Sequence, residues 1–523
     1  MAKNLTNQEK TEYVLLPVRG THSEDMTSLG VATPSFSKTL RARLRASSAS
    51  GGSPVVPSKT AVNIIHSASP TGAKLAVATP QELATLRVEE PGVRAVPVVF
   101  YDTMRSPRLR ATKRPKPLAT ARGAKTASQA VPKPLLVKVV DPAGNAIRGA
   151  LVVAFTDFAN GIGHDGTTNA RGDVRLTLLD GPQVEVLAIY GVTGYWGLVQ
   201  RGIKLFDGYS VQLTAVDITA HDFVTHLYGS SKATDGKGVV VGVVDTGVDG
   251  QHPDLQVLIS RAFVSAEGDA GDGSPRMKDG EHGTHVAGLI SGKGHGAKHL
   301  HAGRAPAVTL NSYRVFPESG GGATNYDILR AIEAAVEDGC DLINLSLGTP
   351  TPDEAVRDAI KEAFDRGTVC IAAAGNDGRM PLLFPARWSE VISITAIGER
   401  GTYPKDSTET LDEGSPYTTI TANSLNKRRY AARFTNMGPE VIATTPGVGI
   451  ISTLPGAGYG TMSGTSMSSP VACGLLSAEL SRNPTILNMV RTKQRAIEIQ
   501  RLFFSMCTVA GFHQDFEGLG LPK

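Results

Sequence analysis

The sequence Gly238-Val-Val-Val-Gly-Val-Val-Asp-Thr-Gly-Val-Asp249 decides the fold of the longest part of the chain. Its apolar run is almost continuous up to Val244, which is typical of a β-strand buried on both faces. The run ends abruptly at a carboxylate, Asp245. Such strands belong to parallel sheets covered by helices, and an open α/β sheet places its functional side chains where the strands end.

Strands and helices alternate through residues 220–523. Further strand candidates lie at 308–315, 342–347, 369–374 and 391–397. Between them, apolar spacing predicts a helix over 326–338, and Thr351-Pro-Asp-Glu354 predicts a capping box that begins another. This alternation predicts an α/β fold with a mostly parallel sheet covered on both faces. Residues 398–433 form a polar insertion, which we expect to be a surface loop.

Three more strings stand at predicted strand ends or helix starts. They are His282-Gly-Thr-His-Val-Ala-Gly288, Ala372-Ala-Ala-Gly-Asn-Asp-Gly378 and Ser463-Gly-Thr-Ser-Met-Ser-Ser-Pro470. Each string alone is weak evidence, because an Asp after a strand is often a turn residue and a Ser at a helix start is often an N-cap. Four such strings in this order, inside an α/β pattern, leave little room for an accidental match.

At these motifs the sequence resembles the subtilisin family of serine peptidases, and the resemblance covers nearly all of residues 220–523. It implies a subtilisin-like three-layer fold and a serine endopeptidase that works through an acyl-enzyme on Ser466. By the same match His282 is the general base, Asp245 orients it, and Asn376 supplies the side chain of the oxyanion hole. This chemistry needs an imidazole beside the hydroxyl and fixed donors for the developing oxyanion.

The resemblance also implies where a peptide substrate lies. One strand is expected to pair with the substrate backbone, a Gly-rich segment to form the opposite edge, and a carboxylate to stand at the mouth of the primary specificity pocket. These residues are Ser346, Leu347, Gly348, Gly320, Gly321, Gly322 and Asp377. A carboxylate at Asp377 favours basic side chains in the pocket, and a solvated turn residue is the equal alternative.

No metal ligand is assigned, and no cofactor is required for this chemistry. Calcium stays an option because Asp254 matches a calcium ligand of the family, but the usual calcium loop is not matched. The corresponding residues 293–303 are basic and rich in histidine. His295, His299 and His301 offer imidazoles to a transition metal, and a solvated loop is the alternative that we favour.

Four zones precede the α/β part: a tail at 1–11, an α+β unit at 12–101, a linker at 102–134 and a β-rich unit at 135–216. Nine Lys or Arg and five Pro mark the linker, a composition that cannot bury a core. Short strands between Gly-rich turns predict a β-sandwich for the β-rich unit, which resembles the regulatory-like domains of carboxypeptidases. The α+β unit resembles subtilisin propeptides.

The propeptide resemblance implies a zymogen whose own N-terminal domain inhibits the active site, with self-cleavage in the basic linker. Expected partners are polypeptide substrates. The net charge of +4 argues against nucleic acid, and no apolar run is long enough to span a membrane. Because no signal peptide is evident, we expect a cytoplasmic enzyme, the alternative being export by a route not visible in this sequence. An inactive subtilisin fold that serves as a binding module is the competing interpretation.

Overall fold

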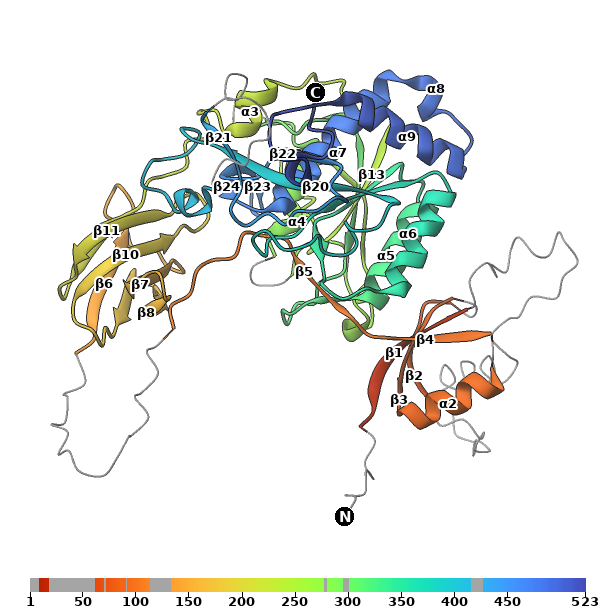
Figure 1. Ribbon diagram of the computed structural model, residues 1–523, viewed down its shortest axis with the longest axis horizontal. Coiled ribbons are helices and arrows are strands. Elements are labelled where there is room, and N and C mark those ends of the chain that lie inside the picture. Colours follow the sequence, from red (N-terminus) through yellow and green to blue (C-terminus); the bar gives the residue numbers. More distant parts are fainter. Residues whose placement is uncertain are drawn as a thin grey trace, which may run out of the picture.

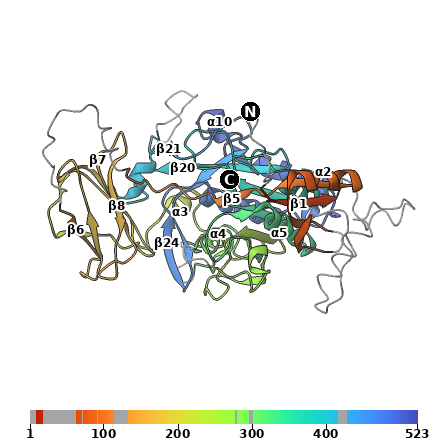
Figure 2. The same ribbon diagram turned by 90° about the horizontal axis from the view of Figure 1, so that it is seen from below.

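The computed structural model describes residues 9–17, 62–69, 72–90, 92–112, 133–276, 280–294, 301–414 and 427–523. They form a large α/β body with a β-sandwich on one side and a small α+β domain on the other (Figure 1). The view at right angles also places the two smaller domains on opposite sides of the α/β body (Figure 2).

The central sheet has the strand order β14-β15-β13-β17-β19-β20-β21, with β22 also paired to β20. Every strand pair is parallel except the β20–β21 pair, so the mostly parallel sheet predicted from the sequence is present. The strands are β13 (Val240–Asp245), β14 (Val257–Ala262), β15 (Thr309–Arg314), β17 (Leu342–Leu345), β19 (Val369–Ala373), β20 (Val391–Glu399), β21 (Arg429–Ala431) and β22 (Ala443–Pro446).

Helices cover both faces of this sheet and make three layers. On one face α4 (His282–Ser291), α7 (Thr465–Arg482) and α9 (Lys493–Met506) share a core that includes Val241 and Val471. On the other face α5 (Asn325–Glu337) and α6 (Glu354–Asp365) pack around Ile343. The shorter elements are α3 (Phe223–Tyr228), η1 (Ser265–Glu267), β23 (Ile450–Leu454), β24 (Gly458–Met462), α8 (Pro484–Leu487), β25 (Cys507–Thr508), α10 (Gln514–Glu517) and β26 (Leu521–Pro522).

The start of α6 differs from the predicted capping box. The helix begins at Glu354, and its N-cap is Asp353, whose carboxylate accepts the backbone N–H of Ala355 at 2.9 Å. Thr351 therefore lies outside the helix. The reason is a competing set of partners, since the same carboxylate also accepts hydrogen bonds from Tyr101 and Asn325.

The N-terminal domain is an antiparallel sheet of order β2-β3-β1-β4 with one helix. Its elements are β1 (Thr11–Pro17), β2 (Asn63–Ser67), β3 (Lys74–Ala78), α2 (Pro80–Glu89) and β4 (Val93–Pro97). Thr79 and Glu82 cap α2 reciprocally. One face of the sheet packs on α2 through Leu15 and Leu83, and the other joins the core formed by α5 and α6.

The β-sandwich has a four-stranded sheet, β11-β10-β7-β8, and a three-stranded sheet, β12-β6-β9. The strands are β6 (Leu135–Val140), β7 (Leu151–Asp157), β8 (Ile162–Thr167), β9 (Asp173–Leu176), β10 (Gln183–Tyr190), β11 (Leu198–Lys204) and β12 (Tyr209–Gln212). Val152 faces the inner core, whereas Leu151, Val153 and Phe155 pack in a second apolar cluster on the outer face. Strand β7 is therefore buried on both sides.

The insertion at 398–433 is not simply a surface loop. Its described part contains η3 (Thr408–Asp412), and Leu411 of η3 is buried in the outer apolar cluster of the sandwich. The backbone N–H of Val199 on β11 also donates to the Asp406 carbonyl. The insertion is partly buried because it joins the sandwich to the α/β body; residues 415–426 lie outside the described residues.

The described start of the predicted linker is not a free tether either. Strand β5 (Phe100–Thr103) lies between β16 (Ala323–Thr324) and β18 (Leu347–Gly348), and the chain continues along the α/β body to Thr112 on the sandwich. Residues 113–132 lie outside the described residues. All four cysteines are free, and three are fully buried, as small core residues. No helix within the described ranges has the length and apolar character needed to cross a membrane.

Candidate active site

Asp245 and His282 meet where β13 ends and α4 begins. His282 Nδ1 lies 2.7 Å from Asp245 Oδ1, and both side chains are almost completely buried. The same carboxylate oxygen accepts the backbone N–H of Thr246 at 2.7 Å. These bonds fix the imidazole with Nδ1 toward the carboxylate, and His282 Nε2 has no partner among the described residues. The ring therefore presents a free nitrogen that can act as a base.

Ser466 is the second residue of α7, at the end of a helix where backbone N–H groups lack intrahelical partners. Its backbone N–H donates to the carbonyl of Met104 at 3.0 Å. Its hydroxyl donates to the Ser346 carbonyl at 3.0 Å, not to His282. The hydrogen bond between the hydroxyl and the base is thus not formed in this arrangement, as is common before the reacting complex assembles.

Asn376 stands on the turn after β19, and its side chain is held in one orientation. Its Oδ1 accepts both the backbone N–H and the hydroxyl of Thr465 at 2.9 Å. The Asn376 residue is only 8% exposed, and its Nδ2 has no partner among the described residues. A buried amide donor without an acceptor is costly, so it favours a ligand oxygen at this place.

The segment that follows the N-terminal domain passes through this site as an extended strand. On one side Thr103 pairs with Leu347 and Asp102 with Gly348, and on the other β5 pairs with β16. Beyond the strand the Met104 N–H donates to the Ser346 carbonyl at 3.1 Å. Strand pairing therefore holds the backbone of this segment along both edges. An extended peptide that adds a strand to a sheet is bound in the same way.

The peptide bond between Met104 and Arg105 is held on both sides. The Met104 carbonyl accepts the Ser466 N–H, and the N–H of Ser106 donates to the Ser463 carbonyl at 2.7 Å. The Met104 side chain is buried against Ala373 and Leu383. Segment 104–106 is thus placed against the candidate nucleophile through its backbone.

Gly464 makes this close approach possible. Its φ is 150°, and a Cβ there would lie 2.4 Å from the Met104 carbonyl oxygen. Any other residue at position 464 would push the segment away from Ser466 and would also strain the backbone.

The residues matched by a known family model are 236–502, and the model is that of the subtilase family. This chain belongs to the subtilase family. It is 33% identical over 289 residues to subtilisin NAT of Bacillus subtilis subsp. natto, an alignment that covers 53% of the chain and 68% of that relative. It is 34% identical over 258 residues to a subtilisin of Bacillus pumilus, covering 49% and 82% respectively. The subtilase is accordingly a subtilisin-like serine peptidase.

The expected substrate-binding residues of the subtilase fall into three groups. Ser346, Leu347 and Gly348 all contact the bound segment through their backbone or by strand pairing. On the opposite edge the pairing residues are Ala323 and Thr324, directly after the Gly-rich stretch. Of that stretch Gly322 touches the strand, since a Cβ there would lie 2.9 Å from the Tyr101 carbonyl oxygen; Gly320 and Gly321 have open space around them.

Asp377 is an exposed turn residue bound to Asn436. Its N–H donates to Asn436 Oδ1 at 2.7 Å, and its carboxylate accepts the Asn436 amide at 3.0 Å. These bonds match the turn-residue alternative, and the residues packed around Met104 are apolar.

Sequence reasoning missed Glu281, which directly precedes His282. Its carboxylate accepts a hydrogen bond of 2.9 Å from the Arg105 guanidinium, the first side chain after the Met104 carbonyl. Burial acts to raise the pKa of Glu281, but the charge of Arg105 and the hydrogen bonds to the carboxylate together outweigh it and leave this pKa below its usual value. The basic residue Arg105 could have suggested that an acidic partner lies nearby. Nothing in the sequence identified that partner as Glu281.

Two further histidines, His285 and His301, are buried and lie against backbone carbonyls. His285 is fully buried, its Nε2 lies 3.0 Å from the Ile450 carbonyl, and burial lowers its pKa to about 3, so it is neutral. His301 is also buried, 3.0 Å from the Ala220 carbonyl, and is not part of a solvated loop. His295 and His299 lie outside the described residues.

Asp254, which matches a calcium ligand of the family, has a protein partner. This carboxylate is buried and accepts a hydrogen bond from the hydroxyl of Tyr459. Among the residues that the structure describes, no group of three His, Cys, Asp or Glu side chains is arranged to hold a metal ion.

Proposed function

We propose that this subtilase is made as a zymogen, that Ser466, His282 and Asp245 form its catalytic triad, and that it first cleaves its own Met104–Arg105 bond. The observation that carries the proposal is the hydrogen bond from the Ser466 N–H to the Met104 carbonyl. A substrate carbonyl has to accept this donor while the serine attacks its carbon.

The reaction follows from the side chains around this carbonyl. The Ser466 hydroxyl turns to His282 Nε2, which takes its proton as Oγ forms a bond to the Met104 carbonyl carbon. The Ser466 N–H and Asn376 Nδ2 receive the oxyanion. The bond to the Arg105 nitrogen then breaks, and His282 returns the proton to that amine. Water hydrolyses the Ser466 ester by the same steps, and other polypeptides follow the same route.

The N-terminal domain is anchored well enough to act as an inhibitor. Arg94 forms ion pairs with Glu354 and Asp358 on α6. The Tyr101 hydroxyl donates to Asp353 at 3.0 Å, and Tyr101 is fully buried. While this domain stays in place, β5 occupies the strand position that a substrate needs.

Self-cleavage is tested by following the N-terminus of the purified full-length chain over time. We expect wild type to release a fragment and to gain a new N-terminus at Arg105. We expect Ser466→Ala, which keeps the fold but lacks the nucleophile, to stay intact under the same conditions. An Arg105 terminus in folded Ser466→Ala protein, or a wild-type chain that is cut only beyond Thr112, would contradict the proposal.

A further inference from the structure

The chain that follows the Met104–Arg105 bond leaves the α/β body and lies on the β-sandwich. The backbone N–H of Leu109 donates to the Tyr190 hydroxyl at 2.7 Å. The backbone N–H of Ala111 donates to Asp165 Oδ2 at 3.1 Å. Both acceptors are sandwich side chains that bind main chain, so these two contacts do not depend on the side chains of the bound segment.

The segment ends by joining the edge of the sandwich. Strand β8 is the last strand of its sheet, and Thr112 forms a parallel bridge with Ile162 on it. The Thr112 N–H donates to the Gly161 carbonyl at 2.8 Å, and the Gly163 N–H donates to the Thr112 carbonyl at 3.1 Å. An exposed sheet edge that accepts an extended peptide in this way is a recognised mode of peptide binding.

Side chains of the segment alternate between the sandwich and solvent. Leu109 and Ala111 are half-buried against the outer apolar cluster that contains Phe155. Arg108 and Arg110 are exposed. Both arginines nevertheless contact sandwich side chains, which give the surface a preference for positive charge.

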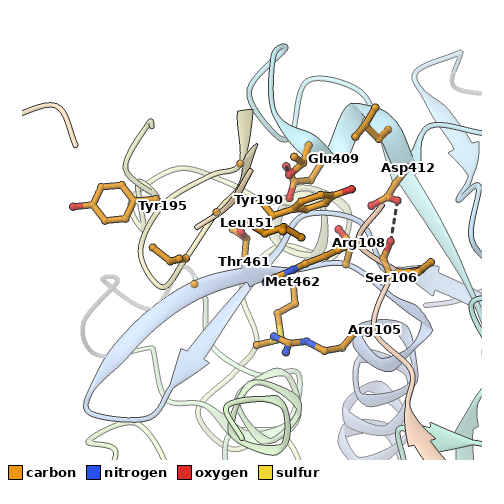
Figure 3. Close-up of a pocket in the computed structure, with 18 of the residues that line it drawn as sticks. Arg105, Ser106, Arg108, Leu151, Tyr190, Tyr195, Glu409, Asp412, Thr461 and Met462 are labelled. Atoms are coloured by element: carbon orange, nitrogen blue, oxygen red, sulfur yellow. Dashed lines mark hydrogen bonds between the residues drawn. The ribbon is translucent and has the colours of Figure 1, made fainter. Parts of the chain in front are cut away.

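Each arginine has one such partner. The Arg108 guanidinium lies 5.8 Å from the centre of the Tyr190 ring, a cation–π contact, and Figure 3 shows the two side chains next to each other. The Arg110 guanidinium donates to Asp165 Oδ1 at 3.1 Å. Nearer the bond, Ser106 donates to Asp412 at 2.9 Å, which Figure 3 marks with a dashed line. A cavity of about 500 Å³ runs along this path between sandwich and α/β body.

We propose that the β-sandwich is the distal substrate-binding site of the peptidase. It would hold the fourth to eighth residues after the cleaved bond of an extended polypeptide, with Arg or Lys at the fourth and sixth positions and apolar or small residues at the fifth and seventh. We infer this sequence preference from the chain's own residues 108–112. They lie on the sandwich while the Met104 carbonyl accepts the Ser466 N–H. The inference rests on the proposed function, because it takes that bond as the one cleaved.

The test compares two peptides as substrates of the self-processed wild-type protein. The short peptide has the sequence of residues 101–107 and the long one that of residues 101–112, so both contain the Met–Arg bond. After self-processing the protein's own residues 108–112 stay tethered beside the sandwich, where they compete with the long peptide alone and reduce the difference between the two peptides. Four hydrogen bonds to the peptide backbone and one exposed ion pair, set against the cost of ordering five more residues and of displacing the tethered segment, predict a kcat/KM about tenfold higher for the long peptide, mostly through KM.

Two matched variants assign this difference to the site. Asp165→Asn removes the charge that binds Arg110 and weakens the acceptor for Ala111, and it should reduce the ratio of long to short peptide to about threefold. Asp173→Asn makes the same change on β9, where the carboxylate pairs with the exposed Arg171, and should leave the ratio unchanged. Equal kcat/KM for both peptides, or an equal fall in both variants, overturns the inference. If neither peptide is hydrolysed, the proposed cleavage of the Met–Arg bond is itself wrong.

Discussion

Ser466 uses two of its groups for two different partners. Its backbone N–H is engaged with the Met104 carbonyl, and its hydroxyl donates to Ser346. His282 Nε2 and Asn376 Nδ2 are left without partners in their buried surroundings among the described residues. The Met104 carbonyl is thus bound and the donors are in place, but the hydrogen bond between the Ser466 hydroxyl and His282 is not formed. An uncleaved zymogen is expected to rest in such a state.

At the residue scale, Asn376→Ala should slow peptide hydrolysis by about 10²–10³-fold in kcat, with a much smaller change in KM. The reason is that the amide serves the oxyanion and not the ground-state carbonyl, which the Ser466 N–H already binds. Steady-state kinetics on the self-processed protein measures this. Circular dichroism of the variant serves as the control, because Asn376 also binds Thr465. A well-folded variant with an unchanged kcat would show that Asn376 is only a turn residue.

The motifs predicted which residue types would stand at strand ends and helix starts. The structure brings Asp245 to His282, and Asn376 to Thr465 next to Ser466, because the ends of parallel strands and the helices that follow them lie at one edge of the sheet. Glu281 was missed, since its partner Arg105 is 176 positions away along the chain. No local pattern reports a contact over that separation.

At the scale of elements, η3 fastens the sandwich to the α/β body. Its residue Leu411 is buried among Leu151, Val153 and Val186. This contact explains why β7 has no polar alternation, since both of its faces are covered. The continuous apolar run at 151–155 carried that signal in the sequence, but it did not reveal that the polar insertion of another domain supplies the cover.

Leu411→Ala should loosen this attachment by about 2 kcal/mol, the lower end of the cost of removing a buried leucine side chain. The Val199 amide reports on it, because it donates to Asp406 across the same contact. Hydrogen exchange of this amide should speed up about thirtyfold in the Ser466→Ala background, which avoids self-digestion. Leu179→Ala, at an exposed leucine of the sandwich, is the matched control. Equal exchange in both variants would show that Leu411 does not hold the sandwich.

At the scale of the whole molecule, one continuous segment links the three bodies. It leaves the sheet of the N-terminal domain, contacts Ser466 at Met104 and reaches the sandwich at Thr112. Composition predicted a basic tether between Asp102 and Pro134, because Lys, Arg and Pro do not form a core. It failed for residues 102–112, where backbone hydrogen bonds to Ser463 and Ser466 hold the chain, and backbone bonds are independent of composition.

We propose that this peptidase is blocked by its own chain until the Met104–Arg105 bond is cut. The most direct test treats the full-length protein with a fluorophosphonate probe during self-processing, and measures labelling and the Arg105 N-terminus in the same samples. We predict that the intact chain stays unlabelled, that labelling of Ser466 rises in step with the new terminus, and that Ser466→Ala shows neither. Full labelling of the intact chain, or a cleaved and folded chain that takes no label, would contradict the account.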